Sequence, residues 1–364
     1  MKKILLITAG IVFGAIIFFL IKLSQFYGNI YIPKLNNGHI QQDKTSYNIL
    51  FLGYGGPGHD GPYLTDTMMV VHLDLKSNKV FQISIPRDAW VKIPTQSGQS
   101  LHSKVNTLYE IVLFLKDFPD VQQIIPTPQG KTNPLTYGVW EVTGLPIDYY
   151  VAIDFSGFVR AVDILGGVDI NVQKSFDDLQ YPVEGKEKDL CGKTEADLPE
   201  LEKIATESPQ LAFPCRYEHL HFDEGLQHMD GTAALKFVRS RHSAQDGGDF
   251  ARAQRQQLFL EGVKEKVLNI GFVPKIIPLL DELKEHIKTD IPFDLTKRFV
   301  GEVKDANSYE ITHLVLSDKD YLDNALSENG QYVLIPKEGQ DNWNNIHQVI
   351  INAIEGVRPN QKKK

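Results

Sequence analysis

The stretch YYVAIDFSGFVRAVDILGGVDINV, residues 149–172, decides the fold class. Residues 149–153 form a short apolar run that is typical of a buried strand, and residues 156–165 show the apolar spacing of a helix. Gly166 and Gly167 end this predicted helix, and residues 168–172 again resemble a strand. A strand, a helix and a second strand in this order indicate an α/β fold.

The neighbouring segments continue the alternation of strands and helices. Further strands are expected over 47–53, 67–74 and 79–85, and helices over 105–115 and 134–143. Together these elements predict an α/β layer sandwich. Later segments at 309–316 and 331–335, with a final helix from about 342, predict a small helical and α/β appendage over 271–358, before a basic tail at 359–364.

The N-terminus has the features of a membrane anchor. An almost wholly apolar run of eighteen residues, Ile4 to Ile21, would form about 27 Å of helix and nearly span a bilayer core. Lys2 and Lys3 with the amino terminus outweigh Lys22, which favours a cytoplasmic N-terminus. We therefore expect a retained anchor over 1–23, a linker over 24–46 and an extracytoplasmic remainder; a cleaved signal peptide is the alternative.

Charge is unevenly distributed along the chain. The formal net charge of -8 argues against a general nucleic-acid binder. Residues 177–207 hold ten Asp or Glu against four lysines, and Cys191 and Cys215 bracket much of this stretch. Outside the cell the two cysteines could form a disulfide worth about 3.5 kcal/mol, although two unrelated thiols remain the alternative. We interpret residues 173–225 as an acidic, stapled insertion without a catalytic role.

A cluster of arginines lies in the second half of the chain. If residues 237–241 are extended, Arg239 and Arg241 point to the same side because side chains alternate along a strand. Guanidinium groups that converge in this way match the oxygens of a phosphate. Structural salt bridges are the alternative, but only two acids in the stretch could pair with its four arginines.

The residues that follow extend this cluster onto a helix. Asp249 is the predicted N-cap of a helix that runs to about Leu268. Arg252, Arg255 and Gln256 would then share one face near the positive end of the helix. The sequence therefore predicts an anion site at this helix N-terminus.

A second candidate site involves Asp66, within TDTMM (65–69), and Arg87, within SIPRD (84–88). Both residues lie at predicted strand ends beside turns, where α/β sheets place ligands. Asp66 could hold Mg²⁺, which takes one or two carboxylates and shares phosphate oxygens, and Arg87 could supply a further guanidinium. The alternatives are that Asp66 caps a turn and that Arg87 pairs with Asp88.

Taken in order, these segments resemble the LytR-CpsA-Psr family of cell-wall glycopolymer ligases. The resemblance runs from about Asn48 to Leu268 and rests on the motifs at 65–69, 84–88, 144–148, 154–158, 165–169, 230–231, 239–242 and 255–257. It implies one N-terminal transmembrane helix and an external catalytic domain over 47–270. It also implies an α/β/α sandwich with a long apolar pocket for a polyprenyl chain.

The resemblance also implies an activity. Members transfer a glycopolymer, such as a teichoic acid or capsule, from polyprenyl pyrophosphate to a peptidoglycan hydroxyl, forming a phosphodiester with Mg²⁺ or Mn²⁺. The implied partners are this lipid-linked glycan, the peptidoglycan acceptor and the membrane, without nucleic acid. The matching catalytic positions are Asp66, Arg87, Arg239, Arg241, Asp249, Arg252 and Gln256. The pyrophosphate-binding positions are Arg87, Arg239, Arg241, Arg252 and Gln256, with Arg255 as further support, and Asp66 is the metal ligand.

The chain departs from the family pattern upstream of Asp66. Residues 53–60, GYGGPGHD, stand where the family has an Asp-x-Arg turn, and Leu64 replaces the usual arginine. The second metal ligand is therefore open, and Asp60 is a guess. Two other functions remain as alternatives: a pyrophosphatase that releases the glycan, or a non-catalytic binder of polyprenyl phosphate or wall polymer. The histidines at 219, 221 and 228 fit no standard zinc spacing.

Overall fold

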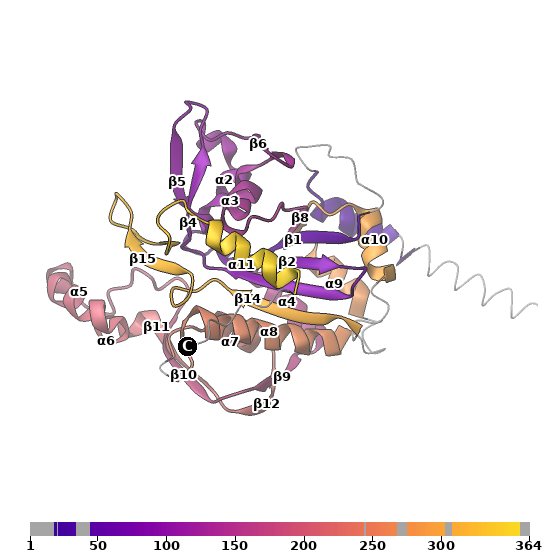
Figure 1. The fold of residues 1–364 in the computed structure, drawn as a ribbon. Helices are drawn as coiled ribbons and strands as arrows, with labels where there is room; N and C mark the ends of the chain where they lie inside the picture. The colour runs from indigo at the N-terminus through magenta and orange to yellow at the C-terminus, as the bar shows by residue number, and fades with distance from the viewer. Residues whose placement is uncertain are drawn as a thin grey trace, which may run out of the picture. The chain divides into compact units, whose positions relative to one another are not determined.

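The apolar runs at 47–53, 67–74 and 79–85 form strands β1 (Ser46–Tyr54), β2 (Thr65–Asp74) and β3 (Lys79–Ile85) in the computed structural model (Figure 1). Each pairs with the next as antiparallel neighbours. Strand β14 (Glu310–Val315) joins β3 in parallel, which makes the central sheet mixed. The sheet order is β13-β8-β1-β2-β3-β14, with β8 at Tyr149–Asp154 and β13 at Ile287–Thr289.

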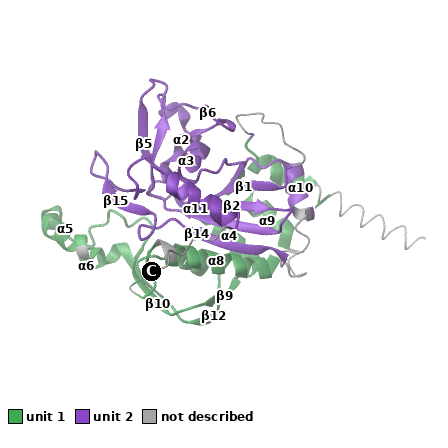
Figure 2. Ribbon diagram, in the orientation of Figure 1, with its two compact units in different colours: residues 1–32, 153–288 green, residues 33–152, 289–364 purple. Residues whose placement is uncertain are grey.

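The structure describes residues 18–19, 21–33, 44–243, 245–267, 275–302 and 308–356. The chain divides into two compact units, which Figure 2 distinguishes by colour. Unit 1 comprises residues 1–32 and 153–288, and unit 2 comprises residues 33–152 and 289–364. The anchor predicted over 1–23 falls largely outside the described ranges, within which no helix is long and apolar enough to cross a membrane.

Unit 2 has its main core around the central sheet. Leu50 and Ile83 from the sheet pack with Val139 of α3 (Pro134–Thr143), whose bounds match the predicted helix. Asn133 caps this helix by accepting a hydrogen bond from the Thr136 N–H at 3.0 Å. The remaining elements of this part of the unit are β4 (Trp90–Pro94), β5 (Ser100–Lys104), α2 (Leu108–Leu113), β6 (Ile125–Thr127) and β7 (Gly130–Thr132).

The C-terminal segment shares this core. Leu334 of β16 (Tyr332–Pro336) and Ile346 of α11 (Asn344–Ile354) are buried in the same hydrophobic cluster as Ile83. Strand β15 (Leu322–Leu326) pairs with β16, and α10 (Phe293–Glu302) precedes the parallel strand β14. Strand β14, which was expected within the appendage, therefore extends the central sheet of unit 2, whereas β16 and the final helix contribute to its core.

Unit 1 is built around a second core. Helix α4 (Phe155–Leu165) leads through Gly166 to β9 (Val168–Val172), as the deciding stretch predicts. Val162, Ile170, Phe176 and Phe237 are all buried in one cluster. Its other elements are β10 (Phe176–Pro182), β11 (Tyr217–Phe222), β12 (Gly225–Met229), α7 (Gly231–Arg239), α8 (Gly248–Val267) and α9 (Ile276–Leu283).

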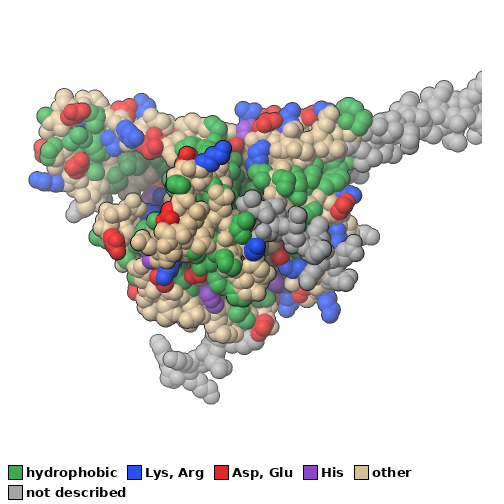
Figure 3. Space-filling view, turned by 90° about the horizontal axis from the view of Figure 1, so that it is seen from above, with side chains coloured by type: hydrophobic (Ala, Val, Ile, Leu, Met, Phe, Trp, Pro, Cys, Tyr) green, Lys and Arg blue, Asp and Glu red, His purple; other side chains and the backbone are tan. Residues whose placement is uncertain are grey.

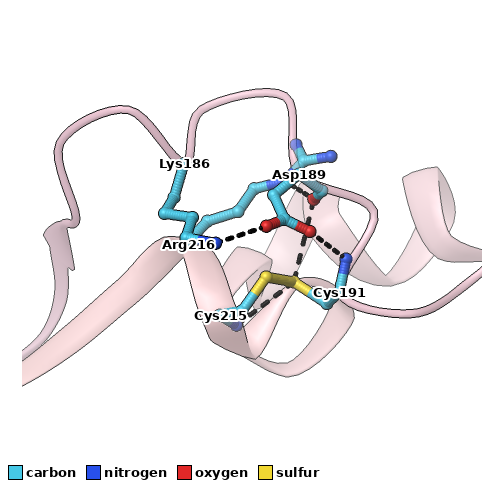
Figure 4. The surroundings of a disulfide bond; sticks show 5 residues. All are labelled: Lys186, Asp189, Cys191, Cys215 and Arg216. Atoms are coloured by element: carbon cyan, nitrogen blue, oxygen red, sulfur yellow. Dashed lines mark hydrogen bonds and ion pairs between the residues drawn. A yellow bond between two sulfur atoms is a disulfide. The ribbon is translucent and has the colours of Figure 1, made fainter.

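A stapled segment connects β10 to β11. Cys191 and Cys215 form the predicted disulfide, beside which Asp189 accepts from the Cys191 N–H at 2.8 Å (Figure 4). The segment contains α5 (Leu198–Glu207) and α6 (Pro209–Ala212), and a small apolar cluster that includes Leu201 and Phe213. Charged and hydrophobic side chains are mixed at the far left of Figure 3, where α5 lies. The insertion expected over 173–225 thus includes two paired strands in addition to the stapled segment.

Replacing Cys191 and Cys215 by alanine should make the segment between them easier to cleave. The crosslink removes loop-closure entropy from the opened state, worth about 3.5 kcal/mol for a loop of this length, and the apolar cluster inside the loop is small. Limited trypsin digestion followed by mass spectrometry should show faster cleavage at Lys193 and Lys203. Cleavage at Lys76, in the exposed turn after β2, is the control and should not change. Equal rates at all three sites would contradict the prediction.

Candidate functional site

Helix α7 carries Arg239 at its last position. The extended conformation predicted for 237–241 is wrong, because the helix continues to Arg239 and ends at Ser240. Asp230 caps the helix by accepting from the Ala233 N–H at 2.8 Å, and Ala234 and Phe237 bury one face. These helix signals outweigh the strand-like appearance of the short apolar run.

The guanidinium of Arg239 lies among aromatic groups. Its Cζ atom is 4.1 Å from the ring centroid of Phe155 and 5.7 Å from that of Tyr181. Its Nη1 donates a hydrogen bond to the Tyr181 hydroxyl at 3.3 Å. Burial raises the pKa of Tyr181, although Arg239 opposes this effect, so the hydroxyl stays protonated at neutral pH. The aromatic contacts hold the guanidinium without neutralising its positive charge.

Arg255 has a different environment from the one expected for a ligand-binding arginine. It is only 2% exposed, and its guanidinium lies 4.5 Å over the Phe176 ring. Nη2 donates to the Ser240 carbonyl at 2.5 Å, and Nη1 donates to the carbonyl and to Oδ2 of Asp246, both at 3.0 Å. Burial lowers the pKa of Arg255 to about 10, so the group remains charged at neutral pH. Its described contacts stabilise the loop between α7 and α8, and its expected part in pyrophosphate binding stays a prediction.

The other predicted residues of this cluster lie along the same loop and helix. Arg241 follows Ser240 in the loop, and its carbonyl accepts from the Gly248 N–H at 2.7 Å. Arg252 is half-buried on α8, and Gln256 donates from Nε2 to the Val238 carbonyl at 3.4 Å. Helix α8 begins at Gly248, one residue before Asp249, whose side chain lies outside the described residues. Unit 1 therefore brings Arg239, Arg241, Arg252 and Gln256 to one loop and its two flanking helices.

Strand β10 supplies support that sequence reasoning missed. Phe176, Asp178 and Tyr181 are all buried. Phe176 lies beneath Arg255, and Tyr181 lies beneath Arg239. Asp178 contacts the residues that follow α7. Asp178 and Tyr181 are three residues apart, so a regular strand would turn them to opposite faces. A shift in the β10–β11 register between these two residues allows both to point inward. Phe176 and Asp178 are two residues apart, so they share one face of a strand, and this spacing was the signal for a buried face. It was missed because it lies in a stretch that was interpreted as a solvated insertion.

The second constellation lies in unit 2. Met68 pairs with Ile85 in the antiparallel β2–β3 ladder, so the start of β2 and the residues after β3 meet at one edge. There Arg87 donates from Nη1 to Asp66 Oδ1 at 2.5 Å, and its Nε lies 3.5 Å from Asp88 Oδ2. The structure thus brings Asp66 and Arg87 together, and the Arg87–Asp88 contact considered as the alternative is present as well. Both partners of the Asp66–Arg87 pair keep about a quarter to a third of their side-chain surface exposed.

The glycine-rich loop between β1 and β2 is held by its own backbone. The Gly56 N–H donates to the Pro62 carbonyl at 2.8 Å, and the Leu64 N–H donates to the Gly61 carbonyl at 3.0 Å. Gly61 has a φ of +63°, and a Cβ there would lie 2.6 Å from Leu64 Cδ1. Asp60 is exposed in this loop. The leucine that replaces the family's arginine therefore packs against the loop that departs from the family pattern.

The described residues offer little for a metal ion held by protein alone. Within them, the one group of three potential ligands is Asp189 with Cys191 and Cys215, whose sulfurs are joined in a disulfide and are not thiolate ligands. Asp66 can offer a carboxylate oxygen, and Mg²⁺ commonly uses one or two carboxylates together with phosphates and water. The donor set at Asp66 fits a cation that a bound phosphate helps to hold.

Two of the three histidines noted in the sequence share a carboxylate. His219 Nε2 and His221 Nδ1 each lie 2.8 Å from Asp177 Oδ1, on the outer side of the β10–β11 pair. His228 contacts Asp169 at 2.7 Å. These contacts are ordinary imidazole–carboxylate hydrogen bonds and account for the positions of all three rings.

Comparison with known proteins identifies the relatives of this chain. The family model described as the LytR_cpsA_psr family matches residues 25–347. A Bacillus subtilis (strain 168) protein named polyisoprenyl-teichoic acid–peptidoglycan teichoic acid transferase TagV is 25% identical over 260 residues. That match covers 71% of this chain and 53% of TagV, so the chain spans about half the length of this relative.

Two further matches agree. A Bacillus anthracis (strain CDC 684 / NRRL 3495) protein with the corresponding name, TagU, is 25% identical over 280 residues, covering 76% of this chain and 72% of TagU. The crystal structure of Bacillus subtilis TagV has a TM-score of 0.52 at 21% identity and covers 87% of this chain and all of that chain. The structural match confirms the mixed α/β fold with a central mixed sheet.

Replacing Arg255 by methionine should destabilise unit 1 by about 3 kcal/mol, because the carbonyls of Ser240 and Asp246 lose a buried charged donor. Urea unfolding followed by far-ultraviolet circular dichroism would measure the loss. Arg252→Met, one turn earlier on α8 and only half-buried, is the matched control and should cost about 1 kcal/mol or less. Equal losses in the two variants would show that Arg255 has no special supporting role.

Proposed function

Because the chain belongs to the LytR_cpsA_psr family, we propose that it transfers a glycopolymer from a polyprenyl-pyrophosphate carrier to a hydroxyl of peptidoglycan. Two relatives are named as teichoic acid transferases that use a polyisoprenyl-teichoic acid and peptidoglycan, which supports this class of donor and acceptor. The glycopolymer in this proposal is a teichoic acid or a capsule polymer.

The proposal rests on the loop between α7 and α8, residues 240–247, which we call the arginine loop. Arg239 ends α7 with its charge set among aromatic rings, and Arg241 follows in a loop whose backbone is fixed by buried groups. A diphosphate presents several anionic oxygens, and planar guanidinium groups can bind them in pairs. Arg252 and Gln256 lie four and eight residues after Gly248, where α8 begins, so both belong to the helix that follows the loop.

The proposed reaction exchanges one phosphorus–oxygen bond for another. The acceptor hydroxyl oxygen forms a bond to the phosphorus that bears the glycan, and the bond from that phosphorus to the bridging oxygen breaks. Polyprenyl phosphate leaves with the electrons of the broken bond. The hydroxyl proton passes to a base, for which Asp249 remains the predicted candidate. Such a transfer depends on positioning and charge neutralisation, which arginine side chains supply.

Asp66 and Arg87 form the second part of the proposal. Asp66 would hold Mg²⁺ or Mn²⁺, with Asp60 as a guess for a second ligand, and the bound ion would neutralise charge on the phosphate oxygens. Arg87 already contacts Asp66, so it can orient this carboxylate, and its guanidinium is the predicted further contact for the anion. The ion pair gives the carboxylate a fixed position at the edge of the sheet.

The proposal includes the cellular setting that the sequence predicts. Residues 1–23 would form a single membrane-spanning anchor with the N-terminus in the cytoplasm and the catalytic part outside. The carrier lipid is held in the membrane, so an anchored enzyme meets its donor there. The α/β/α layering and an apolar pocket for the polyprenyl chain belong to the same proposal.

Arg239→Ala and Arg87→Ala should each reduce transfer roughly 100- to 1000-fold, because each removes a donor to the pyrophosphate oxygens. The purified full chain in detergent would be given polyprenyl-pyrophosphate-linked glycan, Mg²⁺ and peptidoglycan fragments. Mass spectrometry would then detect the glycan-phosphate adduct on the fragment. Arg160→Ala, which changes an exposed arginine on α4 that pairs with Glu282, is the control and should keep the wild-type rate.

The products separate the proposal from its alternatives. Free glycan phosphate without an adduct would favour hydrolysis, and bound but unchanged lipid would favour a binding protein. Wild-type rates in both Arg239→Ala and Arg87→Ala would overturn the assignment of the pyrophosphate site.

A further inference from the structure

Asp178 is a buried carboxylate that the proposed reaction does not use directly. The residue is 1% exposed and lies on the inner face of β10. Its Oδ1 accepts from the Gln180 N–H at 2.9 Å. Its Oδ2 accepts from the Ser240 hydroxyl at 2.7 Å and from the backbone N–H groups of Arg241 and His242, each at 3.1 Å.

The hydrogen bonds keep this carboxylate ionised. Burial alone would raise the pKa of Asp178, but the hydrogen bonds from Ser240 and from the N–H groups of Gln180, His242 and Arg241 lower it below its ordinary value. Asp178 is therefore an anion at neutral pH. An unsatisfied charge at this depth would be costly, so the loop donors and the carboxylate depend on each other.

The three donors to Oδ2 belong to the residues where the chain leaves α7. Ser240 has an extended ψ of 137° and is 1% exposed, so the chain direction changes there. Asp178 also forms an antiparallel bridge with Ser243. The carboxylate thus holds the backbone of the segment that directly follows Arg239 and contains Arg241.

We infer that Asp178 is a positioning residue, which fixes residues 239–243 so that Arg239 and Arg241 present their guanidinium groups in one arrangement to the pyrophosphate. The inference rests on the proposed function and adds a residue to it. The β10 bulge is part of the same device, because it places Tyr181 under Arg239 while Asp178 holds the next residues. Asp178 acts through the backbone and has no direct contact with the ligand in this role.

A simpler role would be stability alone. Asp178 would then lower the free energy of unit 1 without affecting how the arginines bind. The two roles differ in what happens to the folded protein, so the test compares ligand binding and local backbone protection in variants that remain folded.

The experiment uses the full chain in detergent with inorganic pyrophosphate as the probe. Asp178→Asn keeps the size of the side chain but turns an N–H₂ group toward donors. Its dissociation constant for pyrophosphate, measured by calorimetry, should rise roughly 10- to 100-fold, as when groups that orient ligand-binding side chains are lost. Hydrogen exchange of residues 240–243 should accelerate, while exchange in α4 should not change.

Two further variants complete the comparison. Ser240→Ala removes one donor to Asp178 and should give a smaller rise in the same constant, which keeps the test usable if Asp178→Asn does not fold. Asp223→Asn changes a carboxylate that is 81% exposed just after β11 and should leave binding and exchange unchanged.

A double-mutant cycle excludes a purely structural role. If Asp178 acts through the arginine segment, Asp178→Asn should weaken binding by less than about threefold in an Arg241→Ala background, because the two effects are then not additive. Equal losses in both backgrounds would overturn the inference.

The outcomes also separate this inference from the proposed function. If the wild-type chain does not bind pyrophosphate, the proposed function is overturned and this inference with it. If the wild-type chain binds and both Asp178→Asn and Ser240→Ala bind equally well, only the positioning role is overturned. Unchanged hydrogen exchange of residues 240–243 in Asp178→Asn would also overturn it.

Discussion

A buried carboxylate and a buried guanidinium together hold the backbone of the segment that follows α7. Asp178 accepts hydrogen bonds from backbone N–H groups at 241 and 242, whereas Arg255 donates to the carbonyls at 240 and 246. Burial lowers the pKa of Arg255, and the opposite charges of Asp246 and Asp178 oppose this effect. The geometry of the arginine loop depends on this pair, because the loop is too short to supply these partners itself.

The same arrangement explains how the fold tolerates several arginines in one region. Burial is the main cause that lowers the pKa of Arg255, and the like charge of Arg252 adds to this effect. Phe155 and Phe176 offset part of this cost by lying against the guanidinium groups, and Asp178 and Asp246 offset more. A folded state that keeps positive charge fixed in place before binding needs little rearrangement when charge develops on a phosphate.

Local patterns predicted the elements that are bounded by clear signals. The strands at 79–85 and 168–172 and the helix at 134–143 match their predicted bounds, because apolar runs there end at Gly, Pro or Asn. The extended conformation considered for 237–241 was wrong, because the cap at Asp230 and the buried helix face make the chain helical up to Arg239. The supporting role of Asp178 was beyond the sequence, because its partners lie about sixty residues later in the chain. The strand β14 was expected over 309–316, but its parallel pairing with β3 was beyond the sequence for the same reason, because the two strands are distant in the chain.

The stapled segment connects β10 and β11, the antiparallel pair of strands that supports the arginines. The inner face of this pair carries Phe176, Asp178 and Tyr181, so β10 and β11 must keep their register for all three to meet their partners. A one-residue slip in this pairing would turn the side chains of the strand to the other face. The disulfide between Cys191 and Cys215 shortens the free part of the connection between the two strands, and Val183 and Arg216 pair at its base, where the Val183 N–H donates at 2.8 Å. The crosslink therefore closes this connection two residues before β11 begins at Tyr217.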